Sequence, residues 1–346
     1  MKAAVIRKRN EQKIIEIEDA KKPYISNYEA LIKVKSVGIC GSDVQGFNDQ
    51  NSNKRVPGLI MGHEAAGEVV KIGDKVTKVQ PGDRVAIDPQ VTCGNCYACK
   101  RGWYSVCDNK KIIGSNLKGF LHGTMAEYAS INQKQLFVLP DHVEYQEGAV
   151  VEPVSNALHI FNRVKTDIGN QIVVLGAGTL GLCILQVAKL SGARNVIVTD
   201  VSEERLKLAE KLGANITVNS SISEPVEEIK KVTKNRGADI VVEAVGISQT
   251  YKQAIDISRK KGNVMFFGAA QDTIDLNLYP ILHKELNLIG CTGAEWETQT
   301  AVDYIANGKI DVKSLITDQF SLDSTQEAFN LINNKNNQSI KVILKP

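Results

Sequence analysis

The sequence predicts an α/β protein of two domains, a β-rich N-terminal domain followed by a doubly wound parallel sheet. Its length of 346 residues corresponds to about two domains of ordinary size. Up to about residue 150, short apolar segments alternate with turn residues; from about residue 170, continuous apolar strands alternate with amphipathic helices. Unbroken apolar strands are typical of a parallel sheet that is buried on both faces.

The N-terminal part is expected to form short strands joined by turns. Pro57-Gly58 and Pro81-Gly82-Asp83 are typical of turns between strands. Short strands with frequent turns favour a barrel or a sandwich. The expected strands are 2–6, 13–18, 29–38, 64–73 and 84–88.

The second part is expected to alternate strands and helices, as βαβ units do. The apolar residues of 180–190 recur at helical spacing, and the segment 171–176 before them is a continuous apolar strand. The last 50 residues look mixed and end in a β-like segment, 340–346. The other expected elements are strands 195–200, 238–246 and 262–268, and helices 202–213 and 249–258.

Composition excludes several classes of function. The chain has 42 Lys and Arg against 39 Asp and Glu, a net charge of +3, which gives no basic footprint for nucleic acid. It has no apolar run of about 18 residues, so we expect no membrane span. Its first residues become charged too early for the apolar core of a signal peptide. We therefore expect a cytoplasmic protein.

A glycine-rich turn predicts a dinucleotide site. Gly176, Gly178 and Gly181 have the G-x-G-x-x-G spacing between a strand and a helix. This spacing allows a tight turn, close approach of a pyrophosphate and close packing of the helix on the strand. Asp200 ends the next strand, where a carboxylate binds the ribose hydroxyls and repels a 2′-phosphate, favouring NAD over NADP. Further candidates for cofactor contacts are Thr179, Leu180, Arg205 and Val245.

Four of the seven cysteines crowd into one short segment, Cys93, Cys96, Cys99 and Cys107. In a reducing compartment such crowding favours metal binding over disulfides. Four thiolates saturate a tetrahedral zinc ion and leave no position for substrate, so the predicted site is structural. An iron–sulfur cluster is the alternative, and a metal analysis that found iron would favour it.

A second metal site is predicted from dispersed residues. Cys40 follows a strand, and His63 precedes Glu64; with Glu152, they offer the thiolate, imidazole and carboxylate of a catalytic zinc site that keeps one position open. Zinc in such a site acts as a Lewis acid on an oxygen atom. Taken singly, Cys40 and His63 could equally be buried core residues.

The motifs together resemble the zinc-dependent medium-chain alcohol dehydrogenases. The residues that carry the resemblance are C-G-S-D (40–43), G-H-E-A-A-G-E-V-V-K-I-G-D-K-V (62–76), the four cysteines, V-E-P-V-S-N-A-L-H (151–159) and L-G-A-G-T-L-G (175–181). They occur in order along nearly the whole chain. Glu152-Pro153 is similar to the polyol branch of this family, which includes sorbitol and galactitol-1-phosphate dehydrogenases. Threonine dehydrogenases are also similar, but tend to have Thr in place of Ser42 and Asp-Pro in place of Glu152-Pro153.

The resemblance implies an architecture and a set of cofactors. Residues 1–155, completed by about 295–346, would form a GroES-like catalytic domain, and residues 156–294 a Rossmann NAD-binding domain. Two zinc ions per chain, one catalytic and one structural, and NAD are implied. A polyol or polyol phosphate would be the substrate, and the chain would assemble as a homodimer or homotetramer.

The resemblance also implies roles at the catalytic site. Cys40, His63 and either Glu64 or Glu152 would hold the catalytic zinc, and the choice between the two glutamates stays open. Ser42 would accept the substrate proton. Many relatives carry a histidine at the position of Gln45, and because glutamine cannot take up a proton at neutral pH, the proton must leave by another route. Lys54, Arg55, Lys118 and His122 are candidates for binding a substrate anion, and the alternative is that they are solvated side chains of surface loops.

Two other functions remain as alternatives at this stage. One is oxidation of an amino alcohol such as threonine. The other is a non-catalytic NAD-binding relative, against which Cys40, His63 and the two glutamates argue.

Overall fold

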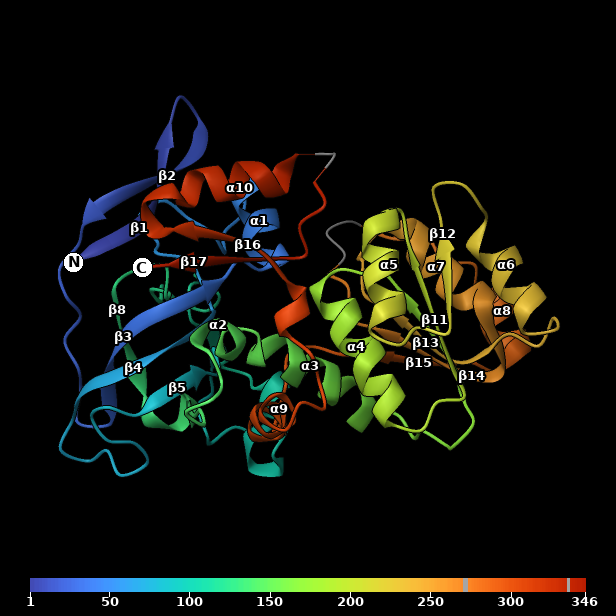
Figure 1. Ribbon diagram of the computed structural model, residues 1–346, viewed down its shortest axis with the longest axis horizontal. Coiled ribbons are helices and arrows are strands. Elements are labelled where there is room, and N and C mark those ends of the chain that lie inside the picture. The colour runs from blue at the N-terminus through green and yellow to red at the C-terminus, as the bar shows by residue number, and fades with distance from the viewer. Residues whose placement is uncertain (270–272, 335–336) are drawn as a thin grey trace. The chain divides into compact units, whose positions relative to one another are not determined.

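The computed structural model describes residues 1–269, 273–334 and 337–346. Two compact units make up the chain, the first formed by residues 1–155 and 294–346 and the second by residues 156–293. Figure 1 shows the ribbon of each unit.

A seven-stranded sheet is the central element of the described part of the first unit. Its order is β16-β17-β3-β4-β5-β9, and β8 pairs with β3. The C-terminal strand pairs antiparallel with β3, with Ile343 opposite Gly38 and Leu344 opposite Val37. The C-terminal strand therefore lies beside β3 in the same sheet, although the two strands come from opposite parts of the sequence (Figure 1). The strands of this sheet are β3 (Glu29–Gly38), β4 (Glu64–Ile72), β5 (Arg84–Ile87), β8 (Tyr128–Asn132), β9 (Leu136–Val138), β16 (Ile316–Ser321) and β17 (Lys341–Lys345).

Two smaller antiparallel pairs and several helices complete the first unit. Strands β1 (Lys2–Arg9) and β2 (Gln12–Asp19) form one pair, and β6 (Gln90–Val91) and β7 (Lys111–Ile112) form the other. The expected strands 2–6, 13–18, 29–38, 64–73 and 84–88 all correspond to strands of the structure. The helices are α1 (Gly41–Asn48), α2 (Tyr145–Gly148), α3 (Val151–Asn162, which runs on into the second unit), α9 (Glu297–Ala306) and α10 (Thr325–Asn333).

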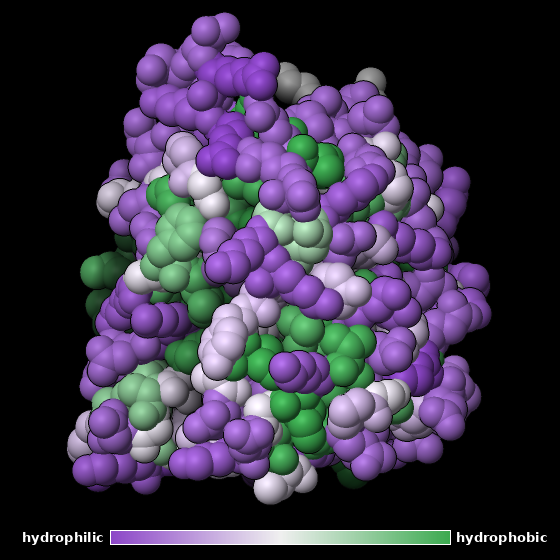
Figure 2. Space-filling view, turned by 90° about the vertical axis from the view of Figure 1, so that its left-hand side faces the viewer, coloured by the Kyte–Doolittle hydropathy of each residue, from purple (hydrophilic) through white to green (hydrophobic). Residues whose placement is uncertain are grey.

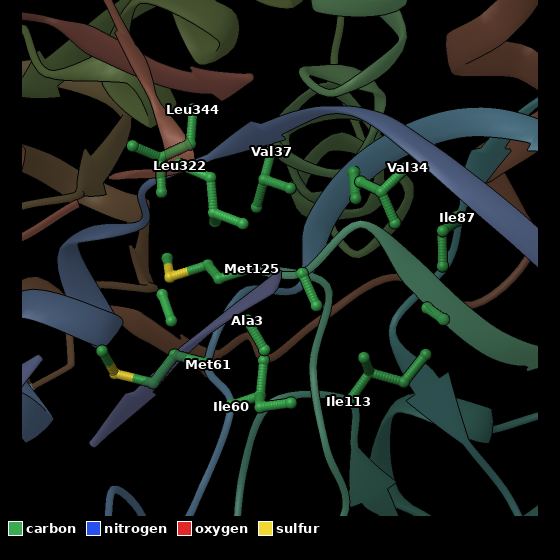
Figure 3. Packing of buried hydrophobic residues seen from close by; sticks show 14 of the residues in the cluster. Ala3, Val34, Val37, Ile60, Met61, Ile87, Ile113, Met125, Leu322 and Leu344 are labelled. Carbon is green, nitrogen blue, oxygen red and sulfur yellow. The ribbon is translucent and has the colours of Figure 1, made fainter. Parts of the chain in front are cut away.

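The hydrophobic core of the first unit draws on both ends of the chain. Ala3 near the N-terminus and Leu344 near the C-terminus are fully buried in the same cluster. Figure 3 shows Leu322 and Leu344 together with Val37 in this packing. Because the tail supplies core residues, the first unit needs residues 294–346 to close its core.

The surface of the first unit is mixed. Figure 2 looks onto the side at the left of Figure 1 and shows a predominantly hydrophilic surface with hydrophobic groups between. No helix among the described residues is both long and apolar enough to cross a membrane, as the sequence analysis expected.

The second unit is a parallel six-stranded sheet with the order β12-β11-β10-β13-β14-β15. Numbered from the first strand of the unit this is 3-2-1-4-5-6, the order of a Rossmann fold, whose ligands bind where the order reverses. The reversal lies between β10 and β13. The strands are β10 (Gln171–Leu175), β11 (Asn195–Asp200), β12 (Ile216–Asn219), β13 (Ala238–Glu243), β14 (Ser258–Phe266) and β15 (Asn287–Gly290).

Helices cover this sheet on both faces. Since crossovers between parallel strands are right-handed, α4 and α5, which lead to β11 and β12, lie on one face, and α7 and α8, which lead to β14 and β15, lie on the other (Figure 1). The central strands are buried because both faces are covered, and every residue of β13 is buried. The helices are α4 (Thr179–Leu190), α5 (Glu203–Lys211), α6 (Pro225–Val232), α7 (Ser248–Ile257) and α8 (Leu278–Lys284).

Candidate metal centres and dinucleotide site

The four clustered cysteines converge in the structure. Cys93, Cys96, Cys99 and Cys107 lie in a loop of two 3-10 turns, and their sulfur atoms all lie within 4.8 Å of one another. The Cys93–Cys99, Cys96–Cys107 and Cys93–Cys107 sulfur distances are 4.0, 3.9 and 3.5 Å. Gly102 ends one 3-10 turn with a φ of 78°, which returns the chain toward Cys107.

This geometry fits a tetrahedral zinc ion. Zinc–sulfur bonds of about 2.3 Å in a tetrahedron place the sulfur atoms roughly 3.8 Å apart, close to the three distances above. Hydrogen bonds from the backbone N–H groups of Asn95 and Cys96 lower the pKa of Cys93 to about 6, whereas burial raises the pKa of Cys99 to about 12, so the cluster favours one thiolate before a metal binds. The residues present therefore fit a structural zinc with four protein ligands.

The second predicted cluster also forms. Cys40 precedes α1, while His63 and Glu64 lie at the start of β4 beside the end of β3. One ligand atom from each of the three residues lies within 4.8 Å of the others. His63 and Glu64 are buried, with 6% and 2% of their surfaces exposed. A thiolate, an imidazole and a carboxylate are three of the four ligands that a catalytic zinc needs, so this donor set also fits the metal.

Asp43 was not singled out from the sequence, yet it supports the cluster directly. Its side chain is completely buried, and Oδ2 lies 3.3 Å from Nδ1 of His63. The other oxygen, Oδ1, accepts a hydrogen bond from Nε of Arg55 at 3.0 Å. A carboxylate at Nδ1 orients the ring and leaves Nε2 as the nitrogen available to a metal. The sequence did contain a signal for this role, because Asp43 is the last residue of the motif C-G-S-D and lies about one helical turn after Cys40.

Arg55 corrects an expectation. It was a candidate for binding a substrate anion, but only 5% of it is exposed and its guanidinium is paired with Asp43. Two other candidates are also engaged within the protein: His122 accepts a hydrogen bond from the backbone N–H of Ile60 through Nδ1, and Lys118 donates to the carbonyl of Asp108. The sequence shows such residue types but not their partners.

Lys341 is the second supporting residue that sequence reasoning missed. It begins β17 and is buried, with 2% of its surface exposed. Its Nζ forms an ion pair with Oε2 of Glu64 and donates to the carbonyl of Ile39. A Cβ at Gly38 would overlap this Glu64 oxygen, so the glycine makes room for the pair. No local signal marks Lys341, because it lies 277 residues from Glu64 in the sequence.

The cluster concentrates negative charge in a buried place. Burial alone would lower the pKa of His63, but the charges of Asp43 and Cys40 raise it well above the ordinary value. Burial likewise opposes the charged form of Lys341, and Glu64 and Cys40 outweigh it and raise its pKa. The negative groups of the cluster therefore stabilise positive charge on the side chains that they contact.

The remaining residues expected at this site lie close to it or on its elements. Ser42 is exposed, and its hydroxyl donates to the sulfur of Cys40 at 3.3 Å. Glu152 lies in the first turn of α3 and is near enough to Lys341 to raise the pKa of that lysine. Gln45 is half-buried on α1.

The glycine turn of the second unit has the predicted geometry. Gly176 follows β10 with a φ of 102°, and a Cβ at Gly181 would collide with the Gly176 carbonyl. Helix α4 begins at Thr179, and Gly178 at its N-cap has no heavy atom within 4 Å of its Cβ position. The turn therefore leaves the helix N-terminus open to phosphate groups.

Asp200 lies at the end of β11 beside this turn. Its Oδ2 accepts a hydrogen bond from the Ala177 N–H at 2.7 Å, and its Oδ1 accepts one from the Ser202 N–H at 2.9 Å. Both carboxylate oxygens keep further lone pairs, so Asp200 can hold the turn and still accept from a ribose hydroxyl. Arg205 lies on α5, and Val245, which is 45% exposed, follows β13.

Comparison with known families decides the class of protein. Residues 26–141 match the alcohol dehydrogenase GroES-like domain, and residues 179–307 match the zinc-binding dehydrogenase family. The chain belongs to the zinc-binding alcohol dehydrogenases. This confirms the resemblance, the fold class and the assignment as an enzyme that the sequence analysis made.

Relatives along the whole chain agree with this family. The chain is 36% identical to sorbitol dehydrogenase of Bacillus subtilis (strain 168) over 349 aligned residues, which cover 100% of this chain and 97% of the relative. The crystal structure of galactitol-1-phosphate dehydrogenase from Escherichia coli is 30% identical with a TM-score of 0.90 and covers 100% of both chains.

The cofactors follow from the family and a further structure. A protein described as a zinc-binding dehydrogenase, from Sinorhizobium meliloti 1021, was solved bound to NADP; it is 29% identical with a TM-score of 0.91, and the match covers 100% of this chain and 99% of that one. Zinc and a nicotinamide dinucleotide are therefore the cofactors of the present chain, as a member of this family.

Proposed function

We propose that the chain oxidises a secondary hydroxyl of a polyol or polyol phosphate and transfers the hydride to NAD. The observation that carries the proposal is the cluster of Cys40, His63 and Glu64, in which a carboxylate accompanies the thiolate and the imidazole. Supporting it are the sorbitol dehydrogenase at 36% identity and the galactitol-1-phosphate dehydrogenase structure at 30% identity.

Cys40, His63 and Glu64 are the proposed protein ligands of the catalytic zinc, and Glu152 is the nearby acidic group. Glu64 is favoured because its ligand atom groups with those of Cys40 and His63. Lys341 would hold the other side of the Glu64 carboxylate, and Asp43 would fix the His63 ring. Zinc, when bound, supplies a Lewis acid that lowers the pKa of a hydroxyl group.

The choice between the glutamates can be tested by metal content. Glu64→Gln should reduce zinc from two ions per chain toward one, and Glu152→Gln should retain two while losing activity. The reverse pattern would assign Glu152 as the ligand. Elemental analysis of dialysed protein measures this directly and requires no knowledge of the substrate.

Ser42 is proposed to receive the substrate proton. Its hydroxyl is exposed and adjacent to Cys40, so it lies at the mouth of the cluster. Gln45 has no ionisable group, so the proton would pass from Ser42 to water or to a hydroxyl of the cofactor ribose. Ser42→Ala should lower kcat with little change in zinc content, and an unchanged kcat would remove Ser42 from this role.

Asp200 is the proposed determinant of NAD over NADP. Its carboxylate lies beside the turn that would hold the pyrophosphate, where a 2′-phosphate would meet negative charge. The turn itself can be tested independently: Gly178→Val adds a side chain in open space, so the protein should fold and bind NADH poorly.

The proposed function is tested by a substrate panel. NADH formation at 340 nm would be followed with polyols, their phosphates and L-threonine, on protein of known zinc content. The proposal predicts that kcat/KM is highest for one polyol or polyol phosphate. A higher kcat/KM for L-threonine would instead support amino-alcohol oxidation as the function. If no substrate is turned over, despite full zinc content and tight NADH binding, a non-catalytic protein would be favoured.

A further inference from the structure

Strand β13 carries a buried carboxylate near each end, and only one of them lies at the edge where a dinucleotide would bind. Glu243 is the last residue of the strand and has no exposed surface. It lies opposite Leu175 of β10 and Phe266 of β14 in the sheet register. This places it between the glycine turn after β10 and the loop after β14.

Glu243 joins the two loops that follow β13 and β14. Its Oε1 accepts hydrogen bonds from the N–H groups of Val245 and Gly246 at 2.9 and 2.8 Å and from the hydroxyl of Thr250 at 2.7 Å. Its backbone carbonyl accepts from the N–H groups of Phe267 and Gly268 at 3.0 and 3.1 Å. One residue thus fixes the path of the chain after both strands. Strand β13 therefore ends at residue 243, whereas the sequence had suggested a strand that continues to residue 246.

Two glycines allow these loops to close around the carboxylate. A Cβ at Gly268 would overlap Oε2 of Glu243, and Gly246, whose φ is 92°, has its Cβ position about 3 Å from the backbone of Ala269. Oε2 is buried without a hydrogen-bond partner among the described residues. A buried polar oxygen of this kind opposes stability, so packing alone gives no reason for a glutamate here.

The loop that Glu243 holds reaches the dinucleotide turn. Cγ2 of Val245 lies 2.7 Å from the Cβ position of Gly176, the first glycine of the turn. The Ala244 N–H donates to the Leu175 carbonyl at 3.1 Å. Val245 remains 45% exposed at this edge, which leaves an apolar side chain facing outward beside the turn.

We infer that Glu243 is a positioning residue for the dinucleotide: through the N–H groups of Val245 and Gly246 it holds Val245 against the glycine turn, so that the binding surface is formed before the cofactor arrives. The inference rests on the proposed placement of NAD at the turn 176–181. It does not depend on which substrate is oxidised.

The other carboxylate of β13 provides a matched control. Asp239, near the amino end of the strand, is 4% exposed, accepts from the Gln171 N–H at 2.8 Å and forms ion pairs with Arg236 and Arg259. It is as buried and as well bonded as Glu243, but the amino ends of parallel strands are not where ligands bind. Asp239→Asn should therefore lower the stability of the protein without weakening its binding of the cofactor.

The test measures NADH dissociation constants by fluorescence, together with thermal unfolding, at a temperature where every variant is folded. Glu243→Leu, which removes the acceptor for two N–H groups, should raise the dissociation constant of NADH about 10-fold. Glu243→Gln, whose amide oxygen can still accept them, should stay within about 3-fold, and Asp239→Asn within about 2-fold.

Each outcome decides the matter. Unchanged NADH affinity in Glu243→Leu, or an equal loss in Asp239→Asn, would overturn the inference. If Glu243→Leu does not fold, Thr250→Val, which removes one donor, should weaken NADH about 3-fold, and no change there would also overturn it. If Gly178→Val binds NADH as well as wild type does, the proposed placement of the dinucleotide itself fails.

Discussion

Replacing Lys341 by methionine tests the support of the catalytic cluster. The substitution keeps an unbranched side chain but removes the ammonium group that pairs with Glu64, where both partners are almost completely buried, with side-chain exposures of 3% and 2%. Removing one member of a buried pair costs about 3–5 kcal/mol, because the other charge stays buried and loses that partner. We expect the free energy of unfolding of the first unit to fall by that amount.

The chain supplies its own assay and control. Its two tryptophans, Trp103 and Trp296, both belong to the first unit, so tryptophan fluorescence during urea unfolding reports that unit. Lys313 pairs with Glu144 at 2.9 Å in the same unit, but the two side chains are 65% and 50% exposed. Lys313→Met should therefore lower the free energy of unfolding far less than Lys341→Met does.

A double variant separates the pair from general damage. Lys341→Met with Glu64→Gln removes both charges, so it should lose less stability than the sum of the two single variants. Equal losses in Lys341→Met and Lys313→Met, or strict additivity in the double variant, would refute the reasoning.

Three further predictions follow from the contacts above. Burial outweighs the hydrogen bonds from Gln90 and raises the pKa of Asp88 from its ordinary value of 3.8 to about 6. The folded state therefore loses stability as the pH rises from about 4 to 6, and thermal unfolding should show Asp88→Asn about 3 kcal/mol more stable than wild type at pH 7 but close to it at pH 4. Cys107→Ser should leave one zinc per chain by elemental analysis and destabilise the first unit by several kcal/mol. Asp200→Ser should lower the ratio of kcat/KM for NAD to that for NADP by about 10-fold or more, and an unchanged ratio would contradict its assignment.

Much of the fold could be predicted because its signals are local. The apolar run at 171–175 and the glycines after it define one βα unit, and strand 195–200 agrees with the structure at both ends. Helix α1 was missed because two glycines interrupt its eight residues. It is held by tertiary contacts instead: Lys13 donates to the carbonyls of Gly46 and Asp49 at its C-terminal end, and Phe47 packs on Phe329.

The ligand types of the site could be predicted, but their supports could not. Cysteine and histidine spacing indicates metal, and the structure brings Cys40, His63 and Glu64 together. Lys341 comes from the far end of the chain, and Arg55 looked like a surface cation. What a charged residue does depends on its partner, and partners distant in the sequence become visible only in the fold.

The central claim is that the site at Cys40, His63 and Glu64 carries the reaction and the four-cysteine site does not. It is tested most directly by stepwise removal of zinc with a chelator, with zinc content and polyol-dependent NADH formation measured on the same samples. The account predicts that activity falls to zero as zinc falls from two ions per chain to one, and returns when zinc is restored. Full activity in protein that retains one zinc ion only at the four cysteines would contradict it.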